Sequence, residues 1–68
     1  MADYRFVVRE MAANISTPML RQILAHMIEL REYAVSQSDN VALHFIAGAL
    51  AIMGGELATR EQTESQQK

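Results

Sequence analysis

The residues that could carry chemistry are few in this chain of 68 residues. It contains two histidines and no cysteine, and His26 precedes Glu29 by three positions, which brings both side chains to one face of a helix. Di-iron helical bundles use the reverse order, Glu-x-x-His, and add inward carboxylates that the apolar stripes of this chain lack. We therefore expect His26 and Glu29 to be surface residues, and we expect neither a metal nor a cofactor.

The hydroxyl groups offer no catalytic arrangement either. Candidate nucleophiles stand at predicted helix caps and turns, where capping explains them: Ser16, Thr17, Ser36 and Ser38. No serine lies in the glycine-flanked elbow of a hydrolase, and no lysine follows Gly54 and Gly55 as in a phosphate-binding loop. Glu56 and Arg60, four residues apart, predict a surface ion pair worth about 0.3 kcal/mol. We expect that the protein is not an enzyme.

Length and composition favour a soluble helical protein that needs a partner chain. Half of the residues are hydrophobic (50%), 21% are charged and the net charge is −2. A chain this short buries only about 60% of the surface that its unfolded form exposes, and without cysteine it cannot add disulfides. A second copy is the remaining source of stability. The lack of cysteine and of a signal-peptide pattern leads us to expect a cytoplasmic location.

The N-terminal segment, residues 3–15, is predicted to be a short helix with Asp3 as its N-cap. Its larger apolar residues recur at helical spacing: Tyr4, Val7, Val8, Met11 and Ile15. A β-strand is the alternative, because Phe6 and the β-branched residues beside it suit a strand, although the alternation of polar and apolar residues is poor.

Two long antiparallel helices are predicted next. The first begins at residues 16–18, where a serine or threonine can cap and a proline suits the first turn, and it ends near Ser36. Its apolar stripe consists of Leu20, Ile23, Met27, Leu30 and Ala34. The polar turn at 36–40, with Ser38 or Asp39 capping the next helix, is short enough to make the two helices a hairpin.

The last helix, from Val41 to about Arg60, is apolar on every side. One face carries large residues at the spacing of the preceding stripe: Leu43, Ile46, Leu50, Met53 and Leu57. A second face carries small residues, and a third carries Phe45 and Ile52. Residues 61–68 are polar without periodicity, which predicts a frayed or disordered tail after a single domain over residues 1–60.

The small face predicts a homodimer. A helix that is apolar all round must be covered all round, and a single hairpin partner covers only one side. Glycine inside a helix costs about 0.5–1 kcal/mol relative to alanine, which close backbone packing can offset. We expect an all-α, two-fold dimer with a four-helix core and an interface formed by His44, Ala47, Gly48, Ala51, Gly55 and Ala58. The alternative is that the N-terminal segment covers this face within one chain.

The remaining apolar residues predict a surface for another protein. Residues outside both packing faces, or near the chain start, form this predicted surface: Tyr4, Phe6, Phe45 and Ile52. We therefore expect a small regulator or inhibitor that binds and modulates a partner protein. Equally, the N-terminal helix could simply cover Phe45 and Ile52.

Two other functions are weighed against this one. A nucleic-acid-binding regulator could use Arg5 and Arg9, doubled in a dimer, but the acidic balance and scattered basic residues oppose it. A single membrane span could use residues 41–58, about 27 Å long as a helix. His44 and Glu56 within that span, and the absence of a basic cluster beside it, argue against insertion.

Overall fold

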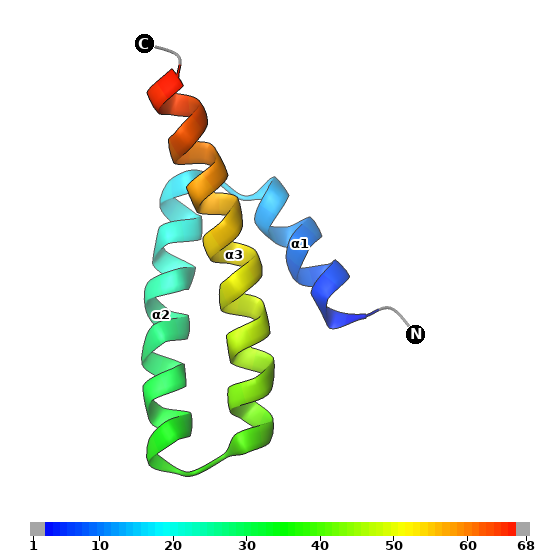
Figure 1. Cartoon of the computed structure of the whole chain (residues 1–68), viewed down its shortest axis with the longest axis vertical. Coiled ribbons are helices and arrows are strands. Elements are labelled where there is room, and N and C mark those ends of the chain that lie inside the picture. The colour runs from blue at the N-terminus through cyan, green and yellow to red at the C-terminus, as the bar shows by residue number, and fades with distance from the viewer. Residues whose placement is uncertain (1–2, 67–68) are drawn as a thin grey trace.

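The chain folds into three helices in a computed structural model that describes residues 3–66. The helices are α1 (Tyr4–Asn14), α2 (Thr17–Ser36) and α3 (Asn40–Gln66), and no strand occurs among the described residues (Figure 1). The expectation of an all-α chain is confirmed, and the N-terminal segment takes the helical alternative rather than the strand.

Each helix begins at a side-chain cap that the sequence predicts. The Asp3 carboxylate accepts a hydrogen bond from the backbone N–H of Arg5, and the Ser16 hydroxyl accepts one from Met19 at 3.3 Å. The Asp39 carboxylate accepts from the backbone N–H of Ala42 at 3.0 Å. These caps satisfy N–H groups that have no partner within the helix, so they fix where each helix starts.

The chain reverses direction between α2 and α3 in three residues. Ser38 takes a left-handed conformation with a φ of 54°. Its N–H donates to the carbonyl of Val35 at 3.0 Å, while the N–H of Asp39 donates to the carbonyl of Ala34 at 3.0 Å. These bonds satisfy carbonyls at the end of α2. As a result α2 and α3 lie side by side and run in opposite directions (Figure 1).

The last helix is longer than the sequence predicts. The polar segment expected to be frayed or disordered is helical as far as Gln66, and residues 67–68 lie outside the described part. Two hydroxyl groups bond back along the helix here: Thr59 donates to the carbonyl of Gly55 and Thr63 donates to the carbonyl of Thr59, each at 3.0 Å. Arg21 of α2 also forms a 3.4 Å ion pair with Glu61, which holds the extension against α2.

The core is small and lies where the three helices meet. The buried hydrophobic residues are Ala12, Leu20, Ala34, Ala49 and Met53. The Cα atoms span only 15 Å along the shortest axis, against 45 and 29 Å along the others. A stable domain is normally built from two packed layers, and α2 and α3 alone form one layer with α1 against part of it. Large apolar surfaces therefore stay exposed in the single chain.

Candidate protein-binding faces

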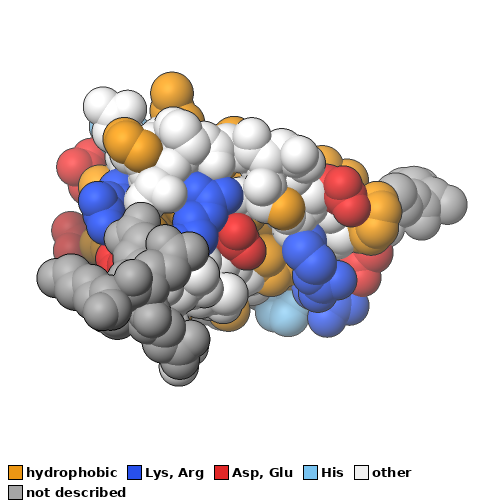
Figure 2. Space-filling model, turned by 90° about the horizontal axis from the view of Figure 1, so that it is seen from above, with side chains coloured by type: hydrophobic (Ala, Val, Ile, Leu, Met, Phe, Trp, Pro, Cys, Tyr) orange, Lys and Arg blue, Asp and Glu red, His pale blue; other side chains and the backbone are white. Residues whose placement is uncertain are grey.

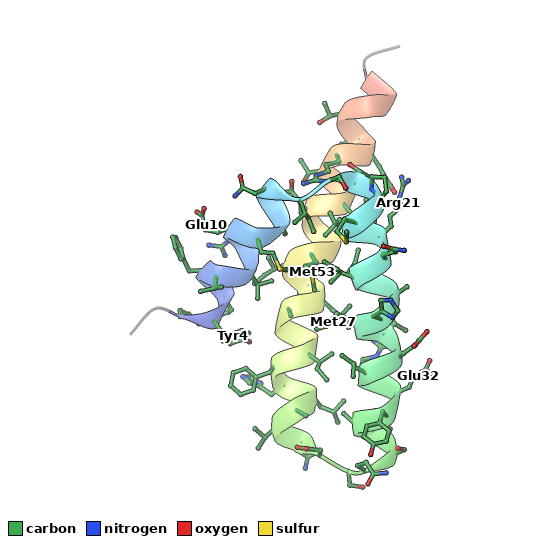
Figure 3. All side chains as sticks on the ribbon, turned by 180° about the vertical axis from the view of Figure 1, so that it is seen from behind. Tyr4, Glu10, Arg21, Met27, Glu32 and Met53 are labelled. Atoms are coloured by element: carbon green, nitrogen blue, oxygen red, sulfur yellow. The ribbon has the colours of Figure 1, made fainter. Side chains whose placement is uncertain are left out.

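The contact between α2 and α3 is made by large apolar side chains. Met53 is 2% exposed and belongs to one buried cluster with Leu20, against which Ile23, Met27 and Leu57 pack. Met27 and Met53 lie between α2 and α3 (Figure 3). This matches the pairing of the two predicted stripes, except that Leu30 is 51% exposed because it lies at the edge of its stripe.

The N-terminal helix covers a different side of α3. Tyr4 packs its ring edge against Phe45, with ring centroids 4.8 Å apart, and reaches over Gly48. A Cβ atom at Gly48 would clash with the Tyr4 hydroxyl and lie 3.3 Å from the ring carbon that carries it. The structure therefore separates Gly48 from the other residues predicted for the dimer interface, because α1 already occupies the space above it.

The other five residues of the predicted dimer interface share one exposed side of α3. We call this set the small-residue face, and it consists of His44, Ala47, Ala51, Gly55 and Ala58. Nothing lies within 4 Å of a Cβ atom placed on Gly55. Ala49, which is buried toward α1, lies about 160° round the helix from Ala51 at 100° per residue. The small-residue face thus points away from α1, and its role in dimerisation stays a prediction.

The residues predicted to bind a partner protein are only partly brought together. Tyr4 and Phe45 contact each other, and Phe45 remains 49% exposed. Ile52 is half-buried, whereas Phe6 is 55% exposed on α1 and contributes to no buried cluster. Tyr4 therefore covers part of Phe45 and leaves the rest of that ring accessible.

Arg60 joins all three helices, which the sequence interpretation missed. Its guanidinium donates to the carbonyl of Ala12 at 2.7 Å, to the hydroxyl of Thr17 at 3.1 Å and to the carboxylate of Glu56 at 3.0 Å. The Arg60 side chain is 18% exposed, so the expectation of an ordinary surface pair is wrong. Only the Glu56 partner was readable from spacing, because Ala12 and Thr17 are more than forty positions away in the sequence.

The described residues offer no site for a small ligand or a metal ion. No pocket is found among residues 3–66, and they contain no group of three histidine, cysteine or acidic residues placed to hold a metal. His26 and Glu29 are both exposed on α2. Catalysis therefore receives no support from this geometry, and protein surfaces are the features left to interpret.

Charged side chains of both signs are mixed on the surface. Figure 2 shows basic, acidic and hydrophobic side chains interspersed over one end of the molecule. Arg5 is paired with Asp3 at 2.9 Å, and this hydrogen-bonded partner lowers the pKa of the Asp3 carboxyl. Arg5 is thus partly neutralised by its neighbour, which weakens the case for a phosphate-binding surface on α1.

One helix is long and apolar enough to cross a membrane. The segment Asn40–Thr63 meets the length and composition of a span, and only 11% of its most apolar window is buried within the structure. A core helix of a soluble protein passes the same test, although such a helix is usually mostly buried. Most of α3 is therefore left partly or fully exposed by α1 and α2 within the single chain.

Comparison of the chain with protein-family models, curated proteins and solved structures finds no match.

Proposed function

We propose that the protein is a small non-enzymatic regulator that acts in the cytoplasm as a helical homodimer and binds a partner protein. The observation that carries this proposal is the poor covering of α3, which is apolar all round and has contacts with α2 and α1 on two sides only. Its small-residue face and much of Phe45 are left uncovered.

The amount of exposed apolar surface supports an assembly rather than a monomer. The exposed large hydrophobic residues outnumber the buried ones, and they are Phe6, Val7, Met11, Met19, Ile28, Leu30, Tyr33, Val35, Val41 and Phe45. Burying apolar surface gains about 25 cal/mol per Å², so association through these residues would strengthen a marginal core. The two helical hairpins would then form a four-helix core.

The two uncovered regions are assigned different roles in this proposal. The small-residue face lets two backbones approach closely, which suits a symmetric contact between copies. The Tyr4–Phe45 pair presents aromatic rings, which are enriched where proteins bind one another. The proposal therefore places dimerisation on one side of α3 and the partner protein on the other.

The first experiment is sedimentation equilibrium of the detergent-free protein over a wide concentration range. A species of twice the chain mass supports the homodimer, and a stable monomer at all concentrations overturns it. Partner binding is then tested by affinity capture with wild-type protein and with Phe45→Asp, followed by binding of the captured protein in purified form. The expected target is lost with Phe45→Asp and retained with Met19→Asp, an exposed substitution outside the proposed surface. Equal capture by all three proteins contradicts the assignment.

A single-span membrane protein is the second candidate, and the low burial of Asn40–Thr63 is the observation that favours it. Glu56 and Arg60 oppose insertion, because charged side chains within a span are costly in the hydrocarbon and Arg60 would have to leave its contacts with Ala12 and Thr17. A requirement for detergent, together with recovery in the membrane fraction, would support this candidate over the first.

A further inference from the structure

We infer that the dimer is antiparallel, with a two-fold axis that passes beside Ala51 and brings together one side of both α2 and α3. This inference rests on the proposed homodimer and names the face and the polarity of the contact. Exposed residues on α2 and on α3 are each arranged symmetrically about a central position, and the two central positions lie at the same level of the helix pair.

The small-residue face is symmetric about its central residue. Ala47 and Gly55 lie four positions before and after Ala51, and His44 and Ala58 lie seven positions before and after it. If a second copy of α3 packs antiparallel at Ala51, Ala47 meets the second copy's Gly55 and His44 meets the second copy's Ala58. Two small residues then meet at each of the central contacts, which permits a close approach of the two backbones.

The neighbouring side of α2 carries a second, independent pattern. Arg21, Ala25, Ile28 and Glu32 follow one stripe at spacings of four, three and four, and all are exposed. Arg21 and Glu32 lie at the outer edge of α2, which points away from both α1 and α3 (Figure 3). Arg21 forms an ion pair with Glu61, which follows Ala58 of the small-residue face by three positions. The stripe therefore flanks the small-residue face at the outer edge of α2.

A two-fold axis makes this stripe complementary to itself. Arg21 and Glu32 are equally distant from a midpoint between residues 26 and 27, so an antiparallel copy places each beside the second copy's opposite charge. The same rotation places Ile28 against the second copy's Ala25, a large residue against a small one. A two-fold axis parallel to the helices and beside α2 would place Arg21 near Arg21 and Glu32 near Glu32, which is unfavourable, and it would separate the two small-residue faces.

The two symmetry centres coincide in space. The hydrogen bond from Arg60 to Thr17 sets residue 17 of α2 level with residue 60 of α3. Counting along the two antiparallel helices from this point places residue 26 level with residue 51. A single two-fold axis therefore pairs both the charges on α2 and the small residues on α3. Two unrelated patterns would not be expected to have their centres at the same level.

The face defined by these residues is small. It is about 21 Å long on α3 and about 20 Å wide, from 1.5 Å per residue and helices about 10 Å apart. About 420 Å² per copy, or about 840 Å² in total, lies below the roughly 1,200 Å² of stable specific interfaces, so we expect a weak dimer that depends on protein concentration. The second copy would also complete the second layer that the thin single chain lacks.

The absence of cysteine permits a direct test by disulfide cross-linking of the full chain under mild oxidation. Ala51→Cys is expected to cross-link to its own copy, because the two-fold axis brings these residues together. His44→Cys alone and Ala58→Cys alone are expected not to cross-link, because each lies about 21 Å from its own counterpart in an antiparallel pair. A mixture of the two is expected to form the mixed dimer.

A charge exchange provides the second arm. Glu32→Arg is expected to weaken dimerisation about tenfold, because two pairs per dimer are reversed, and Arg21→Glu combined with it is expected to restore most of the affinity. Glu29→Arg is the matched control, since Glu29 is exposed on α2 but lies outside the stripe. Thermal melts of each variant show whether a loss of dimer reflects unfolding.

The outcomes separate this inference from the proposed function. Cross-linking of His44→Cys and of Ala58→Cys each to itself would establish a parallel dimer and overturn the inference while leaving the homodimer intact. A dimer by sedimentation with no cross-link at any of the three positions would place the interface elsewhere and also overturn it. A monomer by sedimentation would overturn the proposed homodimer itself.

Discussion

The two contacts that α3 makes within the chain are built differently. Against α2 it buries large side chains, with Leu20 fully buried and Met53 nearly so. Against α1 it uses small residues in the middle and specific contacts at the two ends, Tyr4 over Gly48 and Arg60 on the carbonyl of Ala12. Buried apolar area dominates the first contact, whereas the second depends on individual atoms. Substitutions should therefore act on the two contacts in different ways.

The largest effect is expected from Leu20→Ala, which removes a fully buried side chain at the centre of the α2–α3 contact. We expect a loss of about 3 kcal/mol in the free energy of unfolding, from lost burial and the cavity that remains. Leu30→Ala is the matched control, because Leu30 is 51% exposed, and it should cost less than about 1 kcal/mol. Urea unfolding at a fixed protein concentration measures both, and equal costs would contradict the described core.

Arg60→Ala tests the anchored end of α1. Loss of the three hydrogen bonds from this half-buried guanidinium should cost about 2 kcal/mol, since the carbonyl of Ala12 loses a charged donor. Arg60→Lys should recover only part of this, because one ammonium cannot reach three acceptors in a fixed geometry. Arg21→Ala, which breaks an exposed ion pair, should cost less than about 0.5 kcal/mol. A similar cost for Arg60→Ala and Arg21→Ala in urea unfolding would mean that Arg60 is no anchor.

Gly48→Ala tests the opposite end of α1. The new methyl group must displace the hydroxyl end of the Tyr4 side chain, so we expect alanine to gain less than the roughly 1 kcal/mol that its better helix propensity would give. In a Tyr4→Ala background the same change should stabilise the protein, because the obstacle is gone. Thermal melts of the four proteins give the coupling directly. Independent, additive effects would show that Tyr4 does not cover Gly48 in solution.

Ser38→Gly tests the turn that joins α2 to α3. Ser38 has a φ of 54°, where a side chain is strained and glycine is not. We expect a gain of about 0.5–1 kcal/mol, seen as a higher midpoint in thermal unfolding. Ser38→Ala keeps the Cβ atom and should give no gain, so an equal gain from both substitutions would assign the effect to something other than the backbone.

The smallest effect is expected at the start of α1, from the pH dependence of Asp3. The hydrogen bonds from Arg5 lower the pKa of this carboxyl below its ordinary value of 3.8, so the ionised form is favoured in the folded chain. Its stabilising contribution is therefore present above the unfolded pKa and is lost as the pH falls through the folded pKa. Asp3→Asn retains a good cap, and it should make the thermal midpoint slightly less dependent on pH below about pH 4. An equal dependence of the midpoint on pH in both proteins would contradict this role of Asp3.

Local signals in the sequence predicted where the helices start, but the sequence did not predict the contacts between distant segments. The caps at Asp3, Ser16 and Asp39 are readable because each acts within three residues of itself. The anchor from Arg60 to Ala12 depends on the direction in which α1 leaves α2, which no spacing specifies. The contact between Tyr4 and Gly48 was not predicted for the same reason, since only the path of α1 brings Tyr4 over Gly48.

The off-centre position of the core has a consequence for how the molecule opens. Ala12, Leu20, Ala49 and Met53 cluster where three helices meet, whereas the end near the turn buries only Ala34. Local opening follows the distribution of buried contacts. The backbone amides beside the turn should therefore exchange with solvent first, and those around residues 49–53 last. Local unfolding of the single chain should therefore begin at the turn end, and the turn should be its first point of attack by proteases.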